Sequence, residues 1–415
     1  MLEPRGRARA AVRIVNLQTA YNIEDLRRIA QQRLPRIAYD FLERGAEEEV
    51  TLTENRRAFE RIRFAPRTLV DVSRRSQKVT VFGKTFDSPF GIAPTGAAGL
   101  YCHDADIALA RAARRANVPF ALSTASFVPM ERVIEEAGGD PWFQLYMSKD
   151  RETAERLVKR ALRAGYGVLV YTTDIPVAGN REFNRRNGFE IPLRLGPANI
   201  LDGLLHPRWL AGVFLRTALT SGLPRFRNLD VKVGGRIVAT TLAGFREQRD
   251  ALNWEDFAWL RRLWPKKLLV KGILTAEDAL LALQYGANGI FVSNHGGRQL
   301  DGAPSPIDVL PHIFAAVGGR MTIMVDSGFR RGADIVKALA LGADMVFVGR
   351  PTLYGAAAGG EQGVLRAIDI LKAEIDRVLA LIGCASVDHL DAEYLRFDGA
   401  QLSSLRALRQ RSYAA

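Results

Sequence analysis

Cysteine is scarce in this chain of 415 residues: only Cys102 and Cys384 occur, and they lie far apart. Neither belongs to a Cys-x-x-Cys pattern or to a metal-ligand spacing, which excludes a disulfide framework, a cysteine-rich metal site and c-type haem attachment. No stretch reaches the roughly 18 uncharged apolar residues that a membrane-spanning helix needs. The N-terminal arginines are not followed by the apolar segment of a secretory signal. We therefore expect a protein of the reducing cytoplasm, without a metal site.

The chain has the composition of a folded globular protein and an excess of positive charge. Hydrophobic residues make up 47% and charged residues 25%, which excludes disordered, collagen-like and coiled-coil chains. The formal net charge is +13. Such an excess favours an anionic partner, namely a nucleic acid, a membrane surface or an acidic substrate. The charge alone does not choose among the three.

Eight short β-branched runs, each ending in polar residues or glycine, alternate with segments of helical periodicity. This alternation predicts parallel strand pairing. Successive runs begin 21 to 33 residues apart, except for one step of 100 residues after the fourth. The predicted strands are Gly91–Thr95, Phe120–Thr124, Trp142–Tyr146, Val168–Asp174, Leu268–Gly272, Gly289–Asn294, Thr322–Gly328 and Met345–Arg350. Predicted helices between them include Ala105–Ala116, Arg151–Ala164, Ala276–Tyr285 and Ala333–Leu341.

Eight consecutive strand–helix units predict an α/β protein with a (β/α)8 TIM-barrel fold. An open doubly wound sheet is the second choice, because no glycine-rich fingerprint follows the first strand. The long step after strand 4 is predicted to be a functional insertion, since it lies on the C-terminal side of the barrel, where active sites are found.

Three regions are expected along the chain. Residues 1–88 should form an N-terminal arm, a helical cap and a small hairpin, residues 89–380 the barrel with an insertion at 185–250, and residues 381–415 a C-terminal tail. Within the first region, Ile23–Gly45 is predicted as two helical segments interrupted at Pro35, because proline breaks a helix. Val79–Phe86 is predicted as a hairpin that turns at Gly83-Lys84.

The predicted strand ends carry many hydrogen-bonding groups. Catalytic groups of this fold project from those ends, so their residues outline the mouth of the barrel. We expect a large polar ligand there. In chain order, the ends are Pro94-Thr95-Gly96, Ser123, Gln144 with Tyr146, Thr172 with Asp174, Lys271, Ser293 with His295, Asp326-Ser327-Gly328 and Gly349-Arg350.

The last two strand ends have the features of a phosphate site. Glycines stand beside arginines in Asp326–Gly332 and in Val348–Arg350. Loops after strands 7 and 8 are where such barrels bind phosphate through backbone amides. The alternative is that Arg330, Arg331 and Arg350 are solvated surface charges. The pattern favours a phosphorylated cofactor.

His295 is the candidate base, although a lone histidine is more often structural. The two glycines that follow it let the backbone approach a ligand. Asp174 ends another strand and could orient the imidazole and stabilise its cation. Arg298 and Arg181 are candidates for binding a carboxylate, since guanidinium groups bind carboxylates bidentately, although Arg181 could equally be a surface charge. This set suits the deprotonation of a hydroxy acid.

Lys271 ends the fifth predicted strand and has three possible roles. It could form an ion pair, act as a Schiff-base nucleophile of lowered pKa, or provide a fixed cation beside a cofactor that becomes anionic. The residue pattern leaves all three open.

These motifs together resemble the FMN-dependent L-2-hydroxy acid oxidase and dehydrogenase family, which includes glycolate oxidase and the lactate and mandelate dehydrogenases. The resemblance covers nearly the whole chain, from about Asn22 to about Leu395. Its most specific segment is residues 293–301, joined by Trp142–Tyr146, Leu269–Gly272, Asp326–Gly332 and Lys337–Gly342. The segments Asp71–Ser76 and Asp202–Trp209 look most like membrane-associated mandelate dehydrogenases.

The resemblance implies that FMN is the cofactor and that the barrel region binds it. Lys271 would then lie near the flavin N1 and C2 carbonyl and stabilise negative charge on the reduced ring. Ser293 would add a flavin contact, and Asp326, with Ser327 and Gly328 beside it, would bond the ribityl chain. The remaining implied contacts are Pro94, Thr95 and Gly96 against the flavin, Ser123, Gln144 and Thr172 at the isoalloxazine edge, and Arg330, Gly349 and Arg350 at the phosphate.

The resemblance also implies how the substrate binds. Its carboxylate would lie on Arg181 and Arg298 and its hydroxyl near Tyr146, so that Cα stands between His295 and the flavin. His295 would take a proton while two electrons pass to the flavin. Whether a carbanion forms or a hydride leaves stays open.

Position 41 departs from the family pattern. The family usually has Tyr-Asp-Tyr in the N-terminal cap, with a tyrosine that bonds the substrate carboxylate, whereas this chain has Tyr39-Asp40-Phe41. Phenylalanine cannot make that bond, which is commonly worth ~1.5–3 kcal/mol when the partner is charged. We therefore expect weaker binding of small acids, a compensating group, or a substrate whose far side is apolar.

The insertion carries the features of a membrane-surface segment. Residues 191–245 hold seven lysines and arginines against two aspartates. Within them, Arg208–Arg216 is predicted as a helix with Leu210, Val213 and Phe214 on one side and arginines at both ends, which suits an anionic bilayer surface. The alternative is a helix packed on the barrel or on a sister subunit.

Attachment to a membrane surface would favour a dehydrogenase that passes electrons to a quinone. The alternative is a soluble oxidase that uses oxygen and produces hydrogen peroxide. We expect a cytoplasmic protein held peripherally on the inner face of the cell membrane. Family members often form tetramers, so a homotetramer is expected as well.

Two further functions compete with this one. A non-catalytic FMN-binding or phosphate-binding barrel is compatible with the fold, but it would not need an oriented base such as His295 with Asp174. Nucleic-acid binding would explain the net charge, but no recognised motif or basic–aromatic stacking platform is present.

Overall fold

The computed structural model describes residues 16–189, 196–229 and 248–397. Part of the predicted insertion, the start of the N-terminal arm and the end of the C-terminal tail therefore lie outside the described residues. Within the described residues, no helix is long and apolar enough to cross a bilayer.

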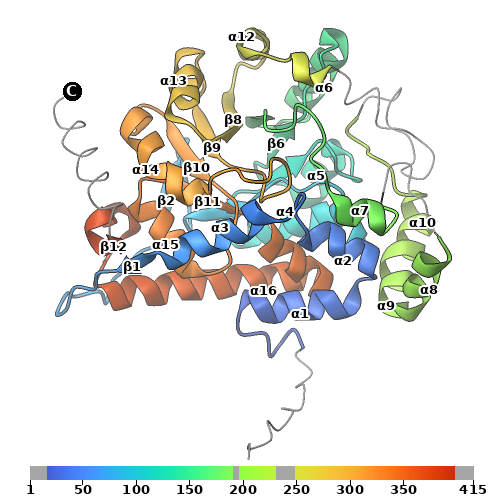
Figure 1. The fold of residues 1–415 in the computed structure, drawn as a ribbon, viewed down its shortest axis with the longest axis horizontal. Helices are drawn as coiled ribbons and strands as arrows, with labels where there is room; N and C mark the ends of the chain where they lie inside the picture. Colours follow the sequence, from blue (N-terminus) through green and yellow to red (C-terminus); the bar gives the residue numbers. More distant parts are fainter. Residues whose placement is uncertain (1–15, 190–195, 230–247, 398–415) are drawn as a thin grey trace, which may run out of the picture.

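Eight parallel strands form the centre of the molecule (Figure 1). Their spatial order is β4-β11-β10-β9-β8-β7-β6-β5, and a bridge between Ile92 and Phe120 joins the first strand to the last. The predicted (β/α)8 barrel is therefore confirmed. The strands are β4 (Phe90–Ile92), β5 (Ala121–Ser123), β6 (Trp142–Leu145), β7 (Val168–Thr172), β8 (Lys267–Ile273), β9 (Gly289–Val292), β10 (Thr322–Val325) and β11 (Met345–Val348).

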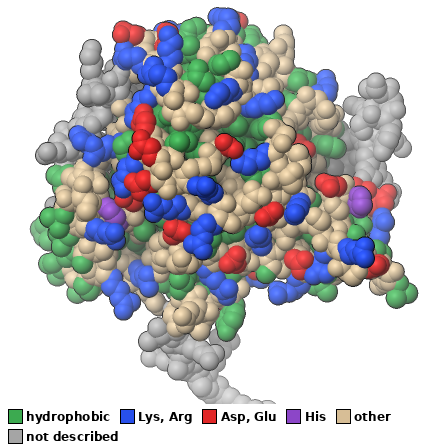
Figure 2. Space-filling model, turned by 180° about the vertical axis from the view of Figure 1, so that it is seen from behind, with side chains coloured by type: hydrophobic (Ala, Val, Ile, Leu, Met, Phe, Trp, Pro, Cys, Tyr) green, Lys and Arg blue, Asp and Glu red, His purple; other side chains and the backbone are tan. Residues whose placement is uncertain are grey.

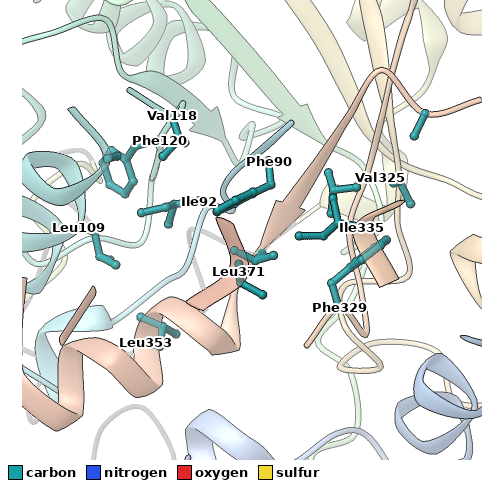
Figure 3. Packing of buried hydrophobic residues seen from close by; sticks show 14 of the residues in the cluster. Phe90, Ile92, Leu109, Val118, Phe120, Val325, Phe329, Ile335, Leu353 and Leu371 are labelled. Atoms are coloured by element: carbon teal, nitrogen blue, oxygen red, sulfur yellow. The ribbon is translucent and has the colours of Figure 1, made fainter. Parts of the chain in front are cut away.

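Burial on both faces explains why these short runs form strands. Every residue of β9 and β11 is buried, as expected for parallel strands covered by helices outside and filled by side chains inside. Inside the barrel, the rings of Phe291 and Phe347 meet edge to face with centroids 4.8 Å apart. Outside it, apolar side chains of strands and helices interdigitate, and Figure 3 shows Phe90, Ile92 and Leu371 in this packing.

Helices follow the strands and cover the barrel. The four predicted helices between strands are all present. The long α16 begins directly after β11 and is kinked where Gly359 and Gly360 leave helical geometry. These helices are α4 (Ala105–Arg115), α5 (Met130–Ala137), α6 (Arg151–Arg163), α12 (Trp254–Leu263), α13 (Ala276–Gln284), α14 (Pro306–Val317), α15 (Gly332–Ala340) and α16 (Arg350–Ile382).

The N-terminal part of the chain packs against the barrel. The two predicted helical segments are α1 (Ile23–Arg33) and α2 (Arg36–Glu43), and Pro35 separates them as the N-cap of α2. Helix α1 lies along α16 (Figure 1). The predicted hairpin is formed by β2 (Val79–Val81) and β3 (Lys84–Phe86). The remaining elements are α3 (Val50–Glu60) and β1 (Ile62–Phe64), which pairs with β12 (Leu395–Phe397).

The described part of the insertion folds into short helices at one side of the molecule (Figure 1). They are α7 (Glu182–Arg186), α8 (Pro197–Leu205), α9 (Pro207–Trp209), a π-helical stretch at Leu210–Leu215 and α10 (Arg216–Ser221). The helix predicted over Arg208–Arg216 is therefore present, with a π-helical stretch in its middle.

The apolar residues predicted to share one side of this segment are only partly exposed. Trp209 donates from its indole nitrogen to the carbonyl of Leu100 at 2.8 Å and stacks on Phe214. Leu210, Val213 and Phe214 are half-buried. The exposed apolar side chains are instead Ile200, Leu201, Leu204, Leu205, Leu215 and Leu219.

Candidate active site

A cavity of about 660 Å³ lies at the C-terminal ends of the barrel strands. Residues at or just after the ends of all eight strands line it, as expected for this fold. Of the residues predicted from sequence, those lining it are Phe41, Pro94, Thr95, Gly96, Tyr146, Arg181, Lys271, His295, Arg298, Asp326, Ser327, Gly328, Arg330, Gly349 and Arg350. Those not lining it are Ser123, Gln144, Thr172, Asp174 and Ser293, which bond lining residues or one another.

His295 and Asp174 form a partly buried pair beside the cavity. The imidazole Nδ1 lies 2.8 Å from Oδ1 of Asp174, which leaves Nε2 as the ring nitrogen for a ligand. The backbone of His295 has a φ of +59°, a conformation that few non-glycine residues adopt. Gly272 in β8 lets Asp174 lie close to the backbone of that strand, since a Cβ at position 272 would lie 2.7 Å from the Cβ of Asp174.

The surroundings of the pair favour a neutral imidazole next to a carboxylate. Burial lowers the pKa of His295, and Lys271 and Arg181 act in the same direction, whereas Asp174 opposes them. Burial alone would raise the pKa of Asp174, but the attraction of His295 and their hydrogen bond outweigh it and hold the value below the ordinary one. An imidazole in this state can accept a proton at neutral pH, and the carboxylate would stabilise the cation that results.

Lys271 belongs to a second buried network at the cavity wall. Its Nζ donates to Ser293 Oγ at 2.5 Å and to Asp326 Oδ2 at 2.6 Å, and Ser293 Oγ donates to Asp326 Oδ1 at 2.5 Å. Of the three possible roles of Lys271, the structure therefore contains the ion pair, which Lys271 forms with Asp326. The same group lines the cavity, so it also remains available as a fixed cation beside a ligand.

Tyr146, Arg181 and Arg298 bring hydrogen-bond donors to the cavity. Burial, with Asp174 adding to it, raises the pKa of Tyr146 to about 12, so the hydroxyl stays protonated at neutral pH. Burial lowers the pKa of Arg298 to about 9, and the charge of Arg181 contributes. Arg298 remains a cation at neutral pH, and two guanidinium groups this close would be stabilised by an anion between them.

The two arginines predicted at the phosphate end make contacts that the residue pattern did not reveal. The guanidinium of Arg350 donates to the carbonyls of Leu42, Gly296 and Arg44 at 3.0–3.3 Å. Arg350 therefore ties the end of α2 to the barrel. Burial, with the nearby charges of Arg330 and Arg298, lowers the pKa of Arg350 to about 10. Arg330 lines the cavity and donates to the carbonyl of Phe329.

Three predicted flavin contacts form a hydrogen-bond chain across neighbouring strands. Ser123 Oγ donates to Gln144 Oε1 at 3.0 Å, and Gln144 Nε2 donates to Thr172 Oγ1 at 2.9 Å. All three side chains are buried. The structure brings the three side chains together.

Phe41 lines the cavity from the end of α2. Its ring stacks on Phe189 with centroids 4.2 Å apart, and the guanidinium of Arg298 lies 4.9 Å from the ring. Arg298 also donates to the carbonyl of Phe41 at 2.8 Å. The side chain and the backbone at position 41 therefore both contact a predicted substrate-binding arginine.

Several lining residues were missed by sequence reasoning. Tyr101 lies near Arg298, Arg350 and Arg181, and burial raises its pKa. Arg249 places its guanidinium 5.0 Å from the ring of Tyr146. Phe127, Phe226 and Leu229 supply apolar surface. None of these residues ends a predicted strand, so no signal in the sequence marked them.

The fold and the cavity define a class of protein: a (β/α)8 barrel with an oriented histidine, a buried lysine and several guanidinium groups at its C-terminal side. The chain matches the family described as FMN-dependent dehydrogenase over residues 30–397. It belongs to the FMN-dependent dehydrogenase family, and the 2-hydroxy acid dehydrogenases and oxidases are its relatives.

Individual relatives are similar over nearly their whole length. The (S)-mandelate dehydrogenase of Pseudomonas putida is 48% identical over 382 residues, which are 92% of this chain and 95% of the relative. The L-lactate oxidase of Nostoc is 40% identical over 383 residues, 91% of this chain and 99% of the relative. A crystal structure of the monotopic membrane protein (S)-mandelate dehydrogenase superposes with a TM-score of 0.86 at 47% identity, covering 92% of this chain and all of that one.

The residues of the cavity fit FMN, the cofactor of this family. The hydroxyl oxygen of Thr95 is buried and has no hydrogen-bond partner in the described structure, although it belongs to a lining residue. A buried polar atom in that state is costly unless a ligand satisfies it. Lys271 and Arg330 add positive charge for the anionic parts of such a ligand.

Proposed function

We propose that this protein oxidises an L-2-hydroxy acid to the 2-oxo acid and passes the electrons to a membrane quinone. The observation that carries this proposal is the His295–Asp174 pair, 2.8 Å apart, beside a cavity that Arg181 and Arg298 also line. A base, its orienting carboxylate and two carboxylate-binding cations are the groups that this reaction needs. A non-catalytic binding barrel would need none of the orientation.

His295 acts as the base in this proposal. Its Nε2 removes a proton from the substrate, and Asp174 holds the ring in place and stabilises the imidazolium. Arg181 and Arg298 bind the substrate carboxylate, and the hydroxyl of Tyr146 donates to the substrate oxygen.

The cofactor is assigned to the rest of the cavity. FMN, when bound, supplies the acceptor for the two electrons that leave the substrate. Lys271, which bonds Ser293 and Asp326, would stabilise negative charge on it. The other proposed holding residues are Pro94, Thr95, Gly96, Ser123, Gln144, Thr172, Ser327, Gly328, Arg330, Gly349 and Arg350.

The exposed apolar residues of the insertion support attachment to a membrane. Leu204, Leu205 and Leu219 are 59%, 71% and 86% exposed, and Arg208 and Arg216 are exposed nearby. Figure 2 shows apolar side chains gathered at the edge of the molecule where α8 and α10 lie. Apolar side chains flanked by arginine suit an anionic bilayer surface, and one structural relative is described as a monotopic membrane protein.

This attachment would place the protein peripherally on the inner face of the cell membrane, close to quinone. An oxidase that uses oxygen is the alternative, since the L-lactate oxidase of Nostoc and a glycolate oxidase of Zea mays are both 40% identical. We further propose a homotetramer. Its subunit would consist of a cap region at 1–88, an FMN-binding barrel at 89–380 with its insertion at 185–250, and a tail at 381–415.

Anaerobic mixing of the flavin-loaded protein with single L-2-hydroxy acids tests the proposal. Lactate, glycolate, mandelate and a long-chain hydroxy acid should be compared, and at least one should bleach the flavin absorbance. Reoxidation by a soluble quinone should then be faster than reoxidation by oxygen. A flavin that no hydroxy acid bleaches would contradict the reaction, and faster reoxidation by oxygen would favour the oxidase.

A further inference from the structure

Residues 226–229 of the insertion lie at the cavity and are fixed there. The backbone N–H of Arg227 donates to the carbonyl of Ser126 at 3.0 Å. The buried side chain of Asn228 accepts from the N–H of Met130 at 2.8 Å and donates to the carbonyl of Val128 at 3.0 Å. These bonds clamp the segment to the loop between β5 and α5.

Phe226 and Leu229 flank this clamp and point their side chains into an apolar cluster at the cavity. They are 6% and 4% exposed, and both line the cavity. Together with Ala97 they form a separate small core, against which Phe41 and Phe127 pack. The rings of Phe127 and Phe226 have their centroids 5.4 Å apart. One wall of the cavity is therefore apolar and largely aromatic, and the insertion contributes Phe226 and Leu229 to it.

Tyr146 stands at the border between this wall and the polar side of the cavity. Its ring packs against the apolar cluster, while the pKa of its hydroxyl responds to Asp174, Arg181 and Arg298. A substrate whose hydroxyl lies near Tyr146 and whose carboxylate lies on the guanidinium groups has its third substituent left for the apolar side.

We propose that Phe226 and Leu229 determine substrate specificity, by accepting a large apolar, aromatic side chain on the carbon that carries the hydroxyl group. The inference rests on the proposed function. Burial of an aryl group against them removes apolar surface from water, which a methyl group does to a much smaller extent. Aromatic rings also gain from offset or edge contacts with Phe226 and Phe127.

The test separates binding of the side chain from the reaction itself. Binding of phenylacetate and of acetate, which carry no hydroxyl group, is measured by calorimetric titration of the flavin-loaded protein. Anaerobic flavin reduction is measured in parallel with mandelate and lactate. The variants are Phe226→Ala and Leu229→Ala, with the milder Phe226→Leu in case the alanine variants fold poorly. Leu219→Ala is the matched control, because Leu219 belongs to the same insertion but is 86% exposed on α10.

Each alanine substitution should weaken phenylacetate binding about tenfold, equivalent to ~1.4 kcal/mol. The affinity for acetate should change by less than about twofold. In each alanine variant, kcat/KM for mandelate divided by kcat/KM for lactate should fall by a similar factor. The Phe226→Leu variant should lie between the parent and the Phe226→Ala variant. Equal losses for both acids, or no loss for either, would overturn the inference. Tighter binding of a dicarboxylic hydroxy acid than of mandelate would also overturn the inference. That result would indicate that the side chain of the substrate binds to Arg249 and not to the apolar wall. If the proposed function itself fails, no acid bleaches the unsubstituted protein, and this result is distinct from all of the others.

Discussion

Asp174 and His295 are 121 residues apart in the chain, yet Oδ1 of one lies 2.8 Å from Nδ1 of the other. The barrel makes this contact, since it brings the ends of β7 and β9 to the same side of the sheet with β8 between them. The hydrogen bond fixes the tautomer and the direction of the ring. The base of the proposed reaction is therefore oriented before a substrate arrives.

Replacing Asp174 with asparagine should slow anaerobic flavin reduction by roughly 10²–10⁴-fold, the range for loss of acid–base orientation. Asp174 raises the pKa of His295, so its removal lowers that pKa further. The acid limb of the rate profile should therefore move to lower pH while the plateau falls. Stopped-flow spectroscopy between pH 5 and 8 measures both effects. A fall in rate without any shift of the acid limb would speak against electrostatic contact between the two residues.

Phe41→Tyr should lower KM for lactate and glycolate by about tenfold or more. The new hydroxyl would stand near Arg298, whose guanidinium lies 4.9 Å from the present ring, and a hydrogen bond to a charged group is worth ~1.5–3 kcal/mol. Steady-state kinetics with both acids checks this. An unchanged or higher KM would mean that position 41 does not face the substrate carboxylate.

A triple variant of Leu204, Leu205 and Leu219 to serine should lose binding to anionic phospholipid vesicles. These side chains carry much of the exposed apolar area of the insertion, and each transfer of apolar surface from water contributes to the attachment. Co-sedimentation gives the bound fraction. Leu381→Ser is the control, because Leu381 is 69% exposed elsewhere on the molecule. Retained binding by the triple variant would assign attachment to another surface.

Asp106→Asn should change how stability depends on pH. Burial raises the pKa of Asp106 from 3.8 to about 7, and Ser126 Oγ donates to its carboxyl group at 2.6 Å. The folded form therefore holds this proton more tightly than the unfolded form, so the carboxyl group contributes stability at low pH that is lost as pH rises from about 4 to about 7.

Asparagine does not titrate, so the free energy of unfolding of the variant should improve relative to the parent by about 1 kcal/mol or more across that interval. Denaturant unfolding at pH 4.5 and pH 8 measures this difference. A constant difference between the two proteins would mean that Asp106 has an ordinary pKa.

Much of the fold could be predicted because strand periodicity and chain spacing depend on local sequence. The ends of the strands carry His295, Asp174 and Lys271, and a barrel must bring such ends to one side. The roles of Arg350 and Arg298 in holding α2 could not be predicted, because their partners are backbone carbonyls, which every residue has.

The insertion shows a second limit of the sequence pattern. Leu210, Val213 and Phe214 have helical spacing, but spacing does not tell whether an apolar side faces solvent or protein. In the structure these three side chains are half-buried, next to Trp209, whose indole nitrogen donates to the carbonyl of Leu100. Phe226 lines the cavity next to Asn228, whose side chain bonds Val128 and Met130, a contact between segments about 100 residues apart that the sequence pattern does not reveal.

Anaerobic stopped-flow reduction of the flavin in a His295→Gln variant tests the central claim most directly. Glutamine keeps a polar side chain of similar reach but cannot accept a proton at neutral pH. The account predicts that the variant binds FMN as the parent does and that an L-2-hydroxy acid reduces it at least about 10²–10⁴-fold more slowly. Reduction within a few-fold of the parent rate would show that His295 is not the base.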